Sequence, residues 1–418
     1  MSIAQDNPTS NRSFGYNSPV TTSTRLTQLY LPILVVWLIL RVGTTLWVMF
    51  LSPLQPLTVI EQSLPLWPAT YTRAWMQRAW VAPWIRWDVK WYIRIIVEGY
   101  QKQNGTAQFH PLFPWLSGWL SSFGISADLS LLVISTISGA VFLVLFTRLA
   151  SLDFEAEVAR SSAWLLLFFP MTIILFAPYP EGLFLCLSAL CLLWMREKKW
   201  GWAGAAGALA ALTRQQGVFL ILPLFWEWQR TEHAQKASWR HKLPSLAAMT
   251  LPAWGLAGWM IYRALALGDL HPDFSSLHNL VYSVIISPSA NQVVTMQTFT
   301  WEAPWVALRQ FWRAPDVDLG VNLALAAVFL IIFGLSWRFL HPAERLLCLA
   351  MFGAGFAYYT GPVHPYMGLP RHLFLAFPIF LPLGQIIRRP WQRLLFTGVG
   401  LLGGAFLLLL YILQSWVI

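Results

Sequence analysis

The sequence predicts an all-α polytopic integral membrane protein. Of its 418 residues, 57% are hydrophobic and 11% are charged, whereas soluble domains carry about 25% charged residues. Apolar stretches of about 20 residues recur from residue 29 to the C-terminus, and each is long enough to cross roughly 30 Å of hydrocarbon. Many of the 25 tryptophans lie near the ends of these stretches, as in an interfacial aromatic belt.

The chain divides into a polar tail and one transmembrane unit. Residues 1–26 are rich in serine, threonine and asparagine, which predicts a disordered tail, and residues 27–418 form the membrane unit. The first span, at about 29–51, is expected to be a retained anchor because it is too long for a signal peptide. A long polar loop with interfacial helices follows at 52–107. The apolar run 109–123 is too short to cross and is expected to be re-entrant or interfacial.

The remaining apolar runs bring the total to about ten or eleven crossings. The expected spans are 129–149, 161–178, 182–195, 201–226, 245–267, 319–339, 346–360, 371–387 and 394–416. The run 201–226 begins with small residues, which allow close helix approach, and is then interrupted by the polar stretch 213–217. An arginine at membrane depth costs about 2.5–3.5 kcal/mol. We therefore expect a re-entrant pair whose tip faces a polar chamber.

Charge predicts the orientation and excludes one class of partner. More than half of the 28 lysines and arginines lie in the tail and in the loops on its side of the membrane, which places the tail in the cytoplasm. The loop 52–107 and the turns at 177–181 and 361–371 then face the extracytoplasmic side. Membrane orientation and anionic lipids account for the formal charge of +10, so nucleic acid is not an expected partner. Three cysteines lie inside apolar runs as small hydrophobic residues.

The segment 86–100 carries the main candidate for catalysis, Asp88. On a helix, Asp88 shares one face with Trp91 and Tyr92, and the helix is expected to end at Gly99. A second, basic stripe is formed by Arg86, Lys90 and Arg94. An amphipathic helix lying on lipid headgroups accounts for that stripe, but it does not account for an acidic residue on the aromatic face. A carboxylate between aromatic side chains suits a base that faces a sugar, because aromatic rings stack on sugar rings.

Other polar residues near the predicted extracytoplasmic turns are candidates for substrate binding. His110 can donate to a phosphate or hydroxyl, or serve as a structural donor. Glu181, next to Tyr179, either binds substrate or caps a helix. Arg214 and Arg371 offer the planar fork that suits phosphate oxygens, although Arg371 can also snorkel to the interface. The full candidate set is Asp88 as the base and Arg214, Arg371, His110, Glu181, Tyr179, Trp87, Trp91, Tyr92 and His364 for substrate.

In order and spacing, these motifs resemble the PIG-V type mannosyltransferases. That group includes GPI mannosyltransferase II and its prokaryotic relatives, and it belongs to the GT-C class of multi-span glycosyltransferases. The matching pieces are Arg86-Trp87-Asp88 through Gly99-Tyr100, Phe109–Pro114, Ala177–Glu181, Leu212-Thr213-Arg214 through Gly217, and Leu369-Pro370-Arg371. Departures include His372, where the family pattern has tyrosine, and His110, where it has an aromatic residue.

The resemblance implies a GT-C-type fold that transfers mannose from polyprenyl- or dolichyl-phosphate mannose. Asp88 matches the family's base, so it takes the proton from an acceptor hydroxyl on the extracytoplasmic face. Transfer inverts the sugar, while Arg214 and Arg371 hold the leaving phosphate. The implied partners are membrane lipids, the lipid-linked sugar and a glycan, lipid or protein acceptor. No cofactor or divalent metal is expected.

The expected location is a prokaryotic plasma membrane, or the ER membrane if the chain is eukaryotic. Two other functions stay open from the sequence. One is a transporter or flippase of lipid-linked saccharides, which would use the same chamber without chemistry. The lack of internal repeats counts against it. The other is a non-catalytic subunit of an assembly.

Overall fold

The computed structural model describes residues 22–54, 81–102, 104–234, 239–268, 302–361 and 364–413, and the single residues 270, 275 and 415. The described residues form helices and turns and no strand. Four helical segments are long and apolar enough to cross a membrane: Leu29–Leu54, Ala127–Ala150, Val317–Phe339 and Pro390–Ile412. The prediction of an all-α membrane protein is confirmed. The predicted disordered tail lies almost wholly outside the described residues.

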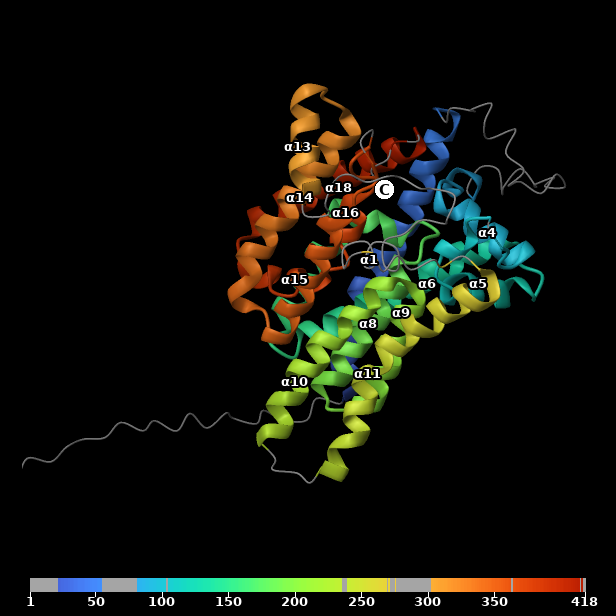
Figure 1. Ribbon diagram of the computed structural model, residues 1–418. Helices are drawn as coiled ribbons and strands as arrows, with labels where there is room; N and C mark the ends of the chain where they lie inside the picture. Colours follow the sequence, from blue (N-terminus) through green and yellow to red (C-terminus); the bar gives the residue numbers. More distant parts are fainter. Residues whose placement is uncertain are drawn as a thin grey trace, which may run out of the picture.

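These four segments belong to α1, α6, α14 and α18, and further helices complete the bundle (Figure 1). The bounds of these four helices are α1 (Thr22–Leu51), α6 (Ala127–Ala150), α14 (Val317–Ser336) and α18 (Pro390–Ile412). The others are α7 (Ala156–Leu167), α8 (Glu181–Arg196), α9 (Trp200–Thr213), α10 (Ile221–Ala234), α11 (Trp239–Tyr262), α13 (Ala303–Arg313) and α15 (Pro342–Ala357).

The predicted break within 201–226 is confirmed. Helix α9 ends at Thr213, Arg214 is extended, and a 3₁₀ turn, η5 (Gln215–Leu220), leads into α10. Small residues allow α9 to pack closely between α8 and α11. A Cβ atom at Gly204 would lie 2.0 Å from the carbonyl oxygen of Ala248 on α11. A larger residue there would force the two helices apart.

Two predicted spans are not continuous helices, and proline is the reason. The span expected at 161–178 consists of α7 followed by the 3₁₀ helix η4 (Pro170–Leu175). The span expected at 371–387 consists of α16 (Leu369–Leu373), η10 (Phe377–Phe380) and α17 (Leu383–Ile386). Pro170, Pro378 and Pro382 lie at these interruptions, and proline removes a helical hydrogen bond and clashes with the preceding turn.

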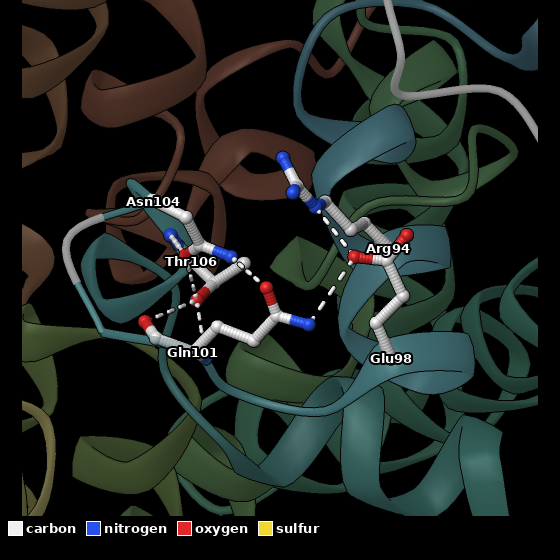
Figure 2. Close-up of polar contacts among 5 residues, drawn as sticks. All are labelled: Arg94, Glu98, Gln101, Asn104 and Thr106. Atoms are coloured by element: carbon white, nitrogen blue, oxygen red, sulfur yellow. Dashed lines mark hydrogen bonds and ion pairs between the residues drawn. The ribbon is translucent and has the colours of Figure 1, made fainter.

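Two short helices, one in the predicted first loop and one directly after it, lie beside α6. Helix α4 (Asp88–Glu98) ends at Gly99, as predicted, and packs on α5 (Leu112–Ser121). Ten residues of helix are about 15 Å long, so α5 is too short to cross a membrane, as expected for the run 109–123. A network of side-chain hydrogen bonds links Arg94, Glu98, Gln101, Asn104 and Thr106 after α4 (Figure 2). This network connects the end of α4 to the turn that precedes Phe109 and His110.

The predicted basic stripe on α4 is wrong at one position. Arg86 is buried, with only 3% of its surface exposed, so it does not lie on lipid headgroups. The helix begins at Asp88, and Arg86 therefore precedes the helix and does not follow its periodicity. Arg94 does lie on the helix surface, where its Nε is 2.9 Å from a carboxylate oxygen of Glu98.

Candidate functional site

Four helix ends converge on one polar cluster. Asp88 is the first residue of α4, Glu181 is the first residue of α8, Arg214 directly follows α9, and Arg371 lies in α16. Asp88 and Arg371 are 283 residues apart in the chain and form an ion pair. Tertiary folding therefore joins four motifs that are separate in the sequence.

Arg371 is shared between the two carboxylates. Its Nη1 donates to Oδ2 of Asp88 at 2.8 Å, and its Nε lies 3.3 Å from Oε1 of Glu181. The centre of the guanidinium also lies 5.2 Å from the ring centroid of Tyr179, within the range of a cation–π interaction. The planar fork of arginine allows all three contacts at once.

Arg214 forms the second half of the cluster. Its Nη1 donates to Oε1 of Glu181, and its Nη2 lies 3.3 Å from Nδ1 of His372. The end of α9 makes this possible, because Arg214 leaves the helix in an extended conformation (φ −152°, ψ 142°). If Arg214 continued the helix, its side chain would point along one helix face, as set by the helical periodicity. The cluster thus holds two cations and two anions, all on different elements.

Exposure separates the roles of the two carboxylates. The Asp88 side chain is 30% exposed, whereas the Glu181 side chain is fully buried. Both lie in the first turn of a helix, where the helix dipole favours negative charge. Asp88 is therefore the carboxylate of the cluster that is accessible from outside the protein, and Glu181 is the internal counterion of the two arginines. The predicted direct contact of Glu181 with substrate stays a prediction.

Asp88 is held in place by an unusual backbone conformation. Trp87, directly before it, has φ 43° and ψ −115°. Positive φ in a bulky residue of this kind costs about 1–3 kcal/mol, and such strain persists only where the surrounding structure enforces it. The turn allows α4 to begin at Asp88, while Arg86 turns into the protein interior.

Several polar atoms of the cluster have unmet hydrogen-bonding capacity. Oε2 of Glu181, Nε of Arg214 and Nε2 of His372 are buried and have no hydrogen-bond partner among the described residues. A buried polar atom without a partner costs about 1–3 kcal/mol. Nε of Arg371 is also buried without a hydrogen-bond partner among the described residues, and four such atoms in one cluster favour a site that is completed by a polar ligand.

His372 is a site residue that the candidate set from the sequence did not include. A guanidinium can only donate, so Nδ1 of His372 accepts from Arg214. The neutral ring then carries its proton on Nε2, which is a buried donor. The ring lies 4.5 Å from that of Tyr358, and the residue is 6% exposed. One indication of this role was present in the sequence: position 372, next to Arg371, carries histidine where the family pattern has tyrosine.

The predicted aromatic residues are mainly packing residues. The ring of Trp91 stacks on Phe109 at 5.9 Å, and Tyr92 meets the edges of Phe109 and Phe113 at 5.1 Å each. Burial, together with the charges of Asp88 and Glu181, raises the pKa of Tyr92 well above its usual value. Tyr92 therefore remains protonated beside the cluster. A contact of Trp87, Trp91 or Tyr92 with a sugar stays a prediction.

His110 has a structural hydrogen bond. Its Nδ1 lies 2.8 Å from the carbonyl oxygen of Ala211, which belongs to the last turn of α9 and lacks the usual helical donor because α9 ends at Thr213. The carbonyl can only accept, so Nδ1 carries the proton. Burial lowers the pKa of His110 to about 3. A direct role of His110 toward a substrate stays a prediction.

His364 lies in the turn between α15 and α16. Its carbonyl oxygen accepts a hydrogen bond from Oγ1 of Thr360 at 2.5 Å. The ion pairs of the cluster do not include its side chain. In the described part of the chain, no group of three or more His, Cys, Asp or Glu residues is arranged to hold a metal ion.

No protein-family model and no curated protein matches the sequence. Among solved structures, the chain is similar to the crystal structure of the Archaeoglobus fulgidus oligosaccharyltransferase in complex with Zn and sulfate, with 13% sequence identity and a TM-score of 0.38. The similarity covers 90% of the present chain and 53% of that protein, so the chain spans about half its length.

Proposed function

We propose that this protein is a membrane glycosyltransferase of the GT-C type. It transfers a sugar, mannose by the motif resemblance, from a polyprenyl- or dolichyl-phosphate donor to an acceptor hydroxyl on the extracytoplasmic face of a prokaryotic plasma membrane. One observation carries the proposal: the partly exposed carboxylate of Asp88 lies 2.8 Å from Arg371, in a cluster that also holds Arg214. A base for a hydroxyl and two cations for a phosphate are the groups this reaction needs.

In the proposed reaction, the oxygen of the acceptor hydroxyl attacks the anomeric carbon of the sugar. Asp88 takes the hydroxyl proton as the new carbon–oxygen bond forms. The bond between the anomeric carbon and the phosphate oxygen breaks, and its electron pair leaves with the lipid phosphate. A single in-line displacement inverts the anomeric configuration. The developing charge on the phosphate is stabilised by Arg214 and Arg371, as preorganised cations stabilise transition states.

Glu181 explains how two arginines are kept close together before a donor binds. Without a buried anion between them, the two guanidinium groups would repel each other. An arriving phosphate competes with Asp88 for Arg371, which loosens the carboxylate and leaves it free to accept a proton. His372 offers an additional Nε2 donor beside both arginines.

Replacement of the base tests the proposal. Purified protein is incubated with a radiolabelled polyprenyl-phosphate mannose and a range of acceptors, and the formation of a new glycosidic bond is measured. We expect Asp88→Asn to lower transfer by about 10²–10⁴-fold, the usual contribution of a general base. The control is Glu98→Gln, which changes a more exposed carboxylate on the same helix and should leave transfer unchanged.

Full transfer by Asp88→Asn would refute the assignment of the base. Movement of the labelled lipid across vesicles, with no new glycosidic bond from the wild-type protein, would support a flippase instead. Transfer that requires an added partner protein would support a subunit of an assembly.

A further inference from the structure

An apolar groove lies between α1, η4 and α18, apart from the polar cluster. It is lined by α1 from Leu40 to Trp47, by the segment around η4 from Leu167 to Phe176, and by α18 from Gly400 to Leu408. Its volume is about 190 Å³, which exceeds the roughly 150 Å³ of an apolar cavity that admits benzene. The groove is therefore wide enough for a segment of hydrocarbon chain.

The two polar side chains in the walls are already hydrogen-bonded within the protein. The hydroxyl of Thr44 donates to the carbonyl of Arg41 at 3.0 Å, and Nε1 of Trp47 donates to the carbonyl of Ala405 at 3.2 Å. The groove consequently presents carbon atoms to its occupant. Such a surface favours an apolar chain and offers no specific partner to a polar molecule.

One glycine keeps the groove open. A Cβ atom added at Gly43 would meet no heavy atom within 4 Å, so this position borders empty space. Gly43 lies in the span Leu29–Leu54, and its neighbours Val42 and Leu46 are 52% and 60% exposed. The groove is therefore accessible from the hydrocarbon of a bilayer.

Two walls of the groove lead along the chain to residues of the polar cluster. Three residues beyond Phe176 the chain reaches Tyr179, and three residues beyond Leu408 it reaches Tyr411. The rings of Tyr179 and Tyr411 are 6.4 Å apart, and the ring of Tyr179 lies under the guanidinium of Arg371 at 5.2 Å. The segments that line the groove thus also position the aromatic residue that contacts Arg371.

Arg41 adds positive charge beside the groove at Phe176. Its Nη1 donates to the carbonyl of Phe176 at 2.5 Å, and its guanidinium lies 5.6 Å from the ring centroid of Trp84. Both partners are neutral. A phosphate between Phe176 and Tyr179 would meet positive charge from Arg41 and from Arg371.

We infer that this groove binds the isoprenoid chain of the lipid-phosphate donor, with the phosphate directed toward Arg371 and Arg214. The inference rests on the proposed function for the identity of the donor. A bilayer phospholipid fits less well, because its headgroup stays at the membrane surface and is not drawn along the walls to the buried cluster. A chain in the groove would also fix the distance between the membrane and the sugar.

Cross-linking without catalysis tests the location. The full-length protein in nanodiscs is irradiated with a C55 polyprenyl phosphate that carries a diazirine in its chain and no sugar, and the labelled peptides are identified by mass spectrometry. We expect labels on α1 between residues 40 and 47 and on α18 between residues 400 and 408, and competition by unlabelled polyprenyl phosphate but not by phosphatidylglycerol. Labels confined to other helices, or equal competition by phosphatidylglycerol, would overturn the inference.

Filling the groove with a side chain tests whether the groove contributes to donor binding. Gly43→Leu places a side chain in the open space, and Gly334→Leu is the matched control, since Gly334 on α14 also has open space at its Cβ and lies in another candidate span. We expect Gly43→Leu to raise the KM for a C55 donor at least tenfold, to leave kcat within twofold, and to leave a C10 donor unaffected. Equal behaviour of the two variants would overturn the inference. Gly43→Ala gives a smaller effect of the same sign if the variant with leucine does not fold.

The two proposals fail separately. A protein that is labelled in the groove but forms no glycosidic bond would refute the glycosyltransferase and keep the lipid site. A protein that transfers sugar but is labelled elsewhere would refute the lipid site and keep the glycosyltransferase.

Discussion

Arg371 provides the sharpest test of the cluster, because one guanidinium makes three different contacts. In Arg371→Lys the positive charge is kept, but a single ammonium cannot reach Asp88 and Glu181 and also lie flat on Tyr179. In Arg371→Met the charge is lost as well. The two variants therefore separate the effect of geometry from the effect of charge.

The expected loss of stability follows from the burial of each partner. Breaking a fully buried ion pair costs about 3–5 kcal/mol. Here Glu181 is buried but keeps Arg214, and Asp88 is 30% exposed and can be hydrated. We therefore expect Arg371→Met to lower the free energy of unfolding by about 1–3 kcal/mol, the cost of leaving buried polar atoms without partners. Arg371→Lys should cost less than Arg371→Met.

The effect on transfer should be larger than the effect on folding. Removal of one group that stabilises a developing negative charge lowers kcat by about 10²–10³-fold, and we expect Arg371→Met to fall in this range. Arg371→Lys should lose about tenfold or more, because the fork that holds phosphate is gone. The assay is the initial rate of sugar transfer by purified protein, with thermal unfolding measured on the same samples.

The control for this series is Arg94→Lys, which alters an arginine on α4 whose carboxylate partner, Glu98, is 38% exposed. Surface pairs of this kind contribute about 0–1 kcal/mol, so both transfer and unfolding should stay near the wild type. Wild-type rates for Arg371→Lys would contradict this prediction, since they would show that the shared fork is unnecessary.

Three further predictions concern histidines and a second ion-pair network. His372→Asn keeps a hydrogen-bond acceptor for Arg214 but loses the Nε2 donor, whereas His372→Gln places an amide donor near the position of Nε2. We expect His372→Asn to raise the KM for the donor lipid and His372→Gln to raise it less. Equal KM values for the two variants would contradict the assignment of the ring proton to Nε2. Because burial lowers the pKa of His110 to about 3, the unfolded state binds more protons between about pH 6.5 and 3. Stability should fall as the pH falls through this range, and His110→Asn should reduce that dependence in thermal unfolding. Arg196→Ala should lower the free energy of unfolding by about 1–3 kcal/mol, because it leaves the buried carboxylate of Glu344 without this partner. Glu344 is 1% exposed and lies 3.3 Å from Arg196. The KM and the rate of transfer by the folded fraction should stay unchanged.

The class of fold and several helix ends follow from the amino-acid sequence alone. Long apolar runs have to become helices in a bilayer, because no water is present to bond the backbone. The polar stretch after Thr213 ends α9, since an arginine in hydrocarbon is costly unless the chain turns toward a polar site. Gly99 ends α4 because glycine adopts the positive φ of 76° required there. These are local effects, and local sequence is sufficient to predict them.

The grouping of the motifs into one site depends on how the helices pack. Local sequence motifs identified Asp88, Glu181, Arg214 and Arg371 as separate candidates. The ion pair of Asp88 with Arg371 joins residues 283 positions apart, and no local pattern predicts such a pair. Packing also turned Trp91 and Tyr92 toward Phe109 and buried Arg86, which periodicity had predicted on the surface. His372 joined the site for the same reason, because its only sequence signal was its position beside Arg371.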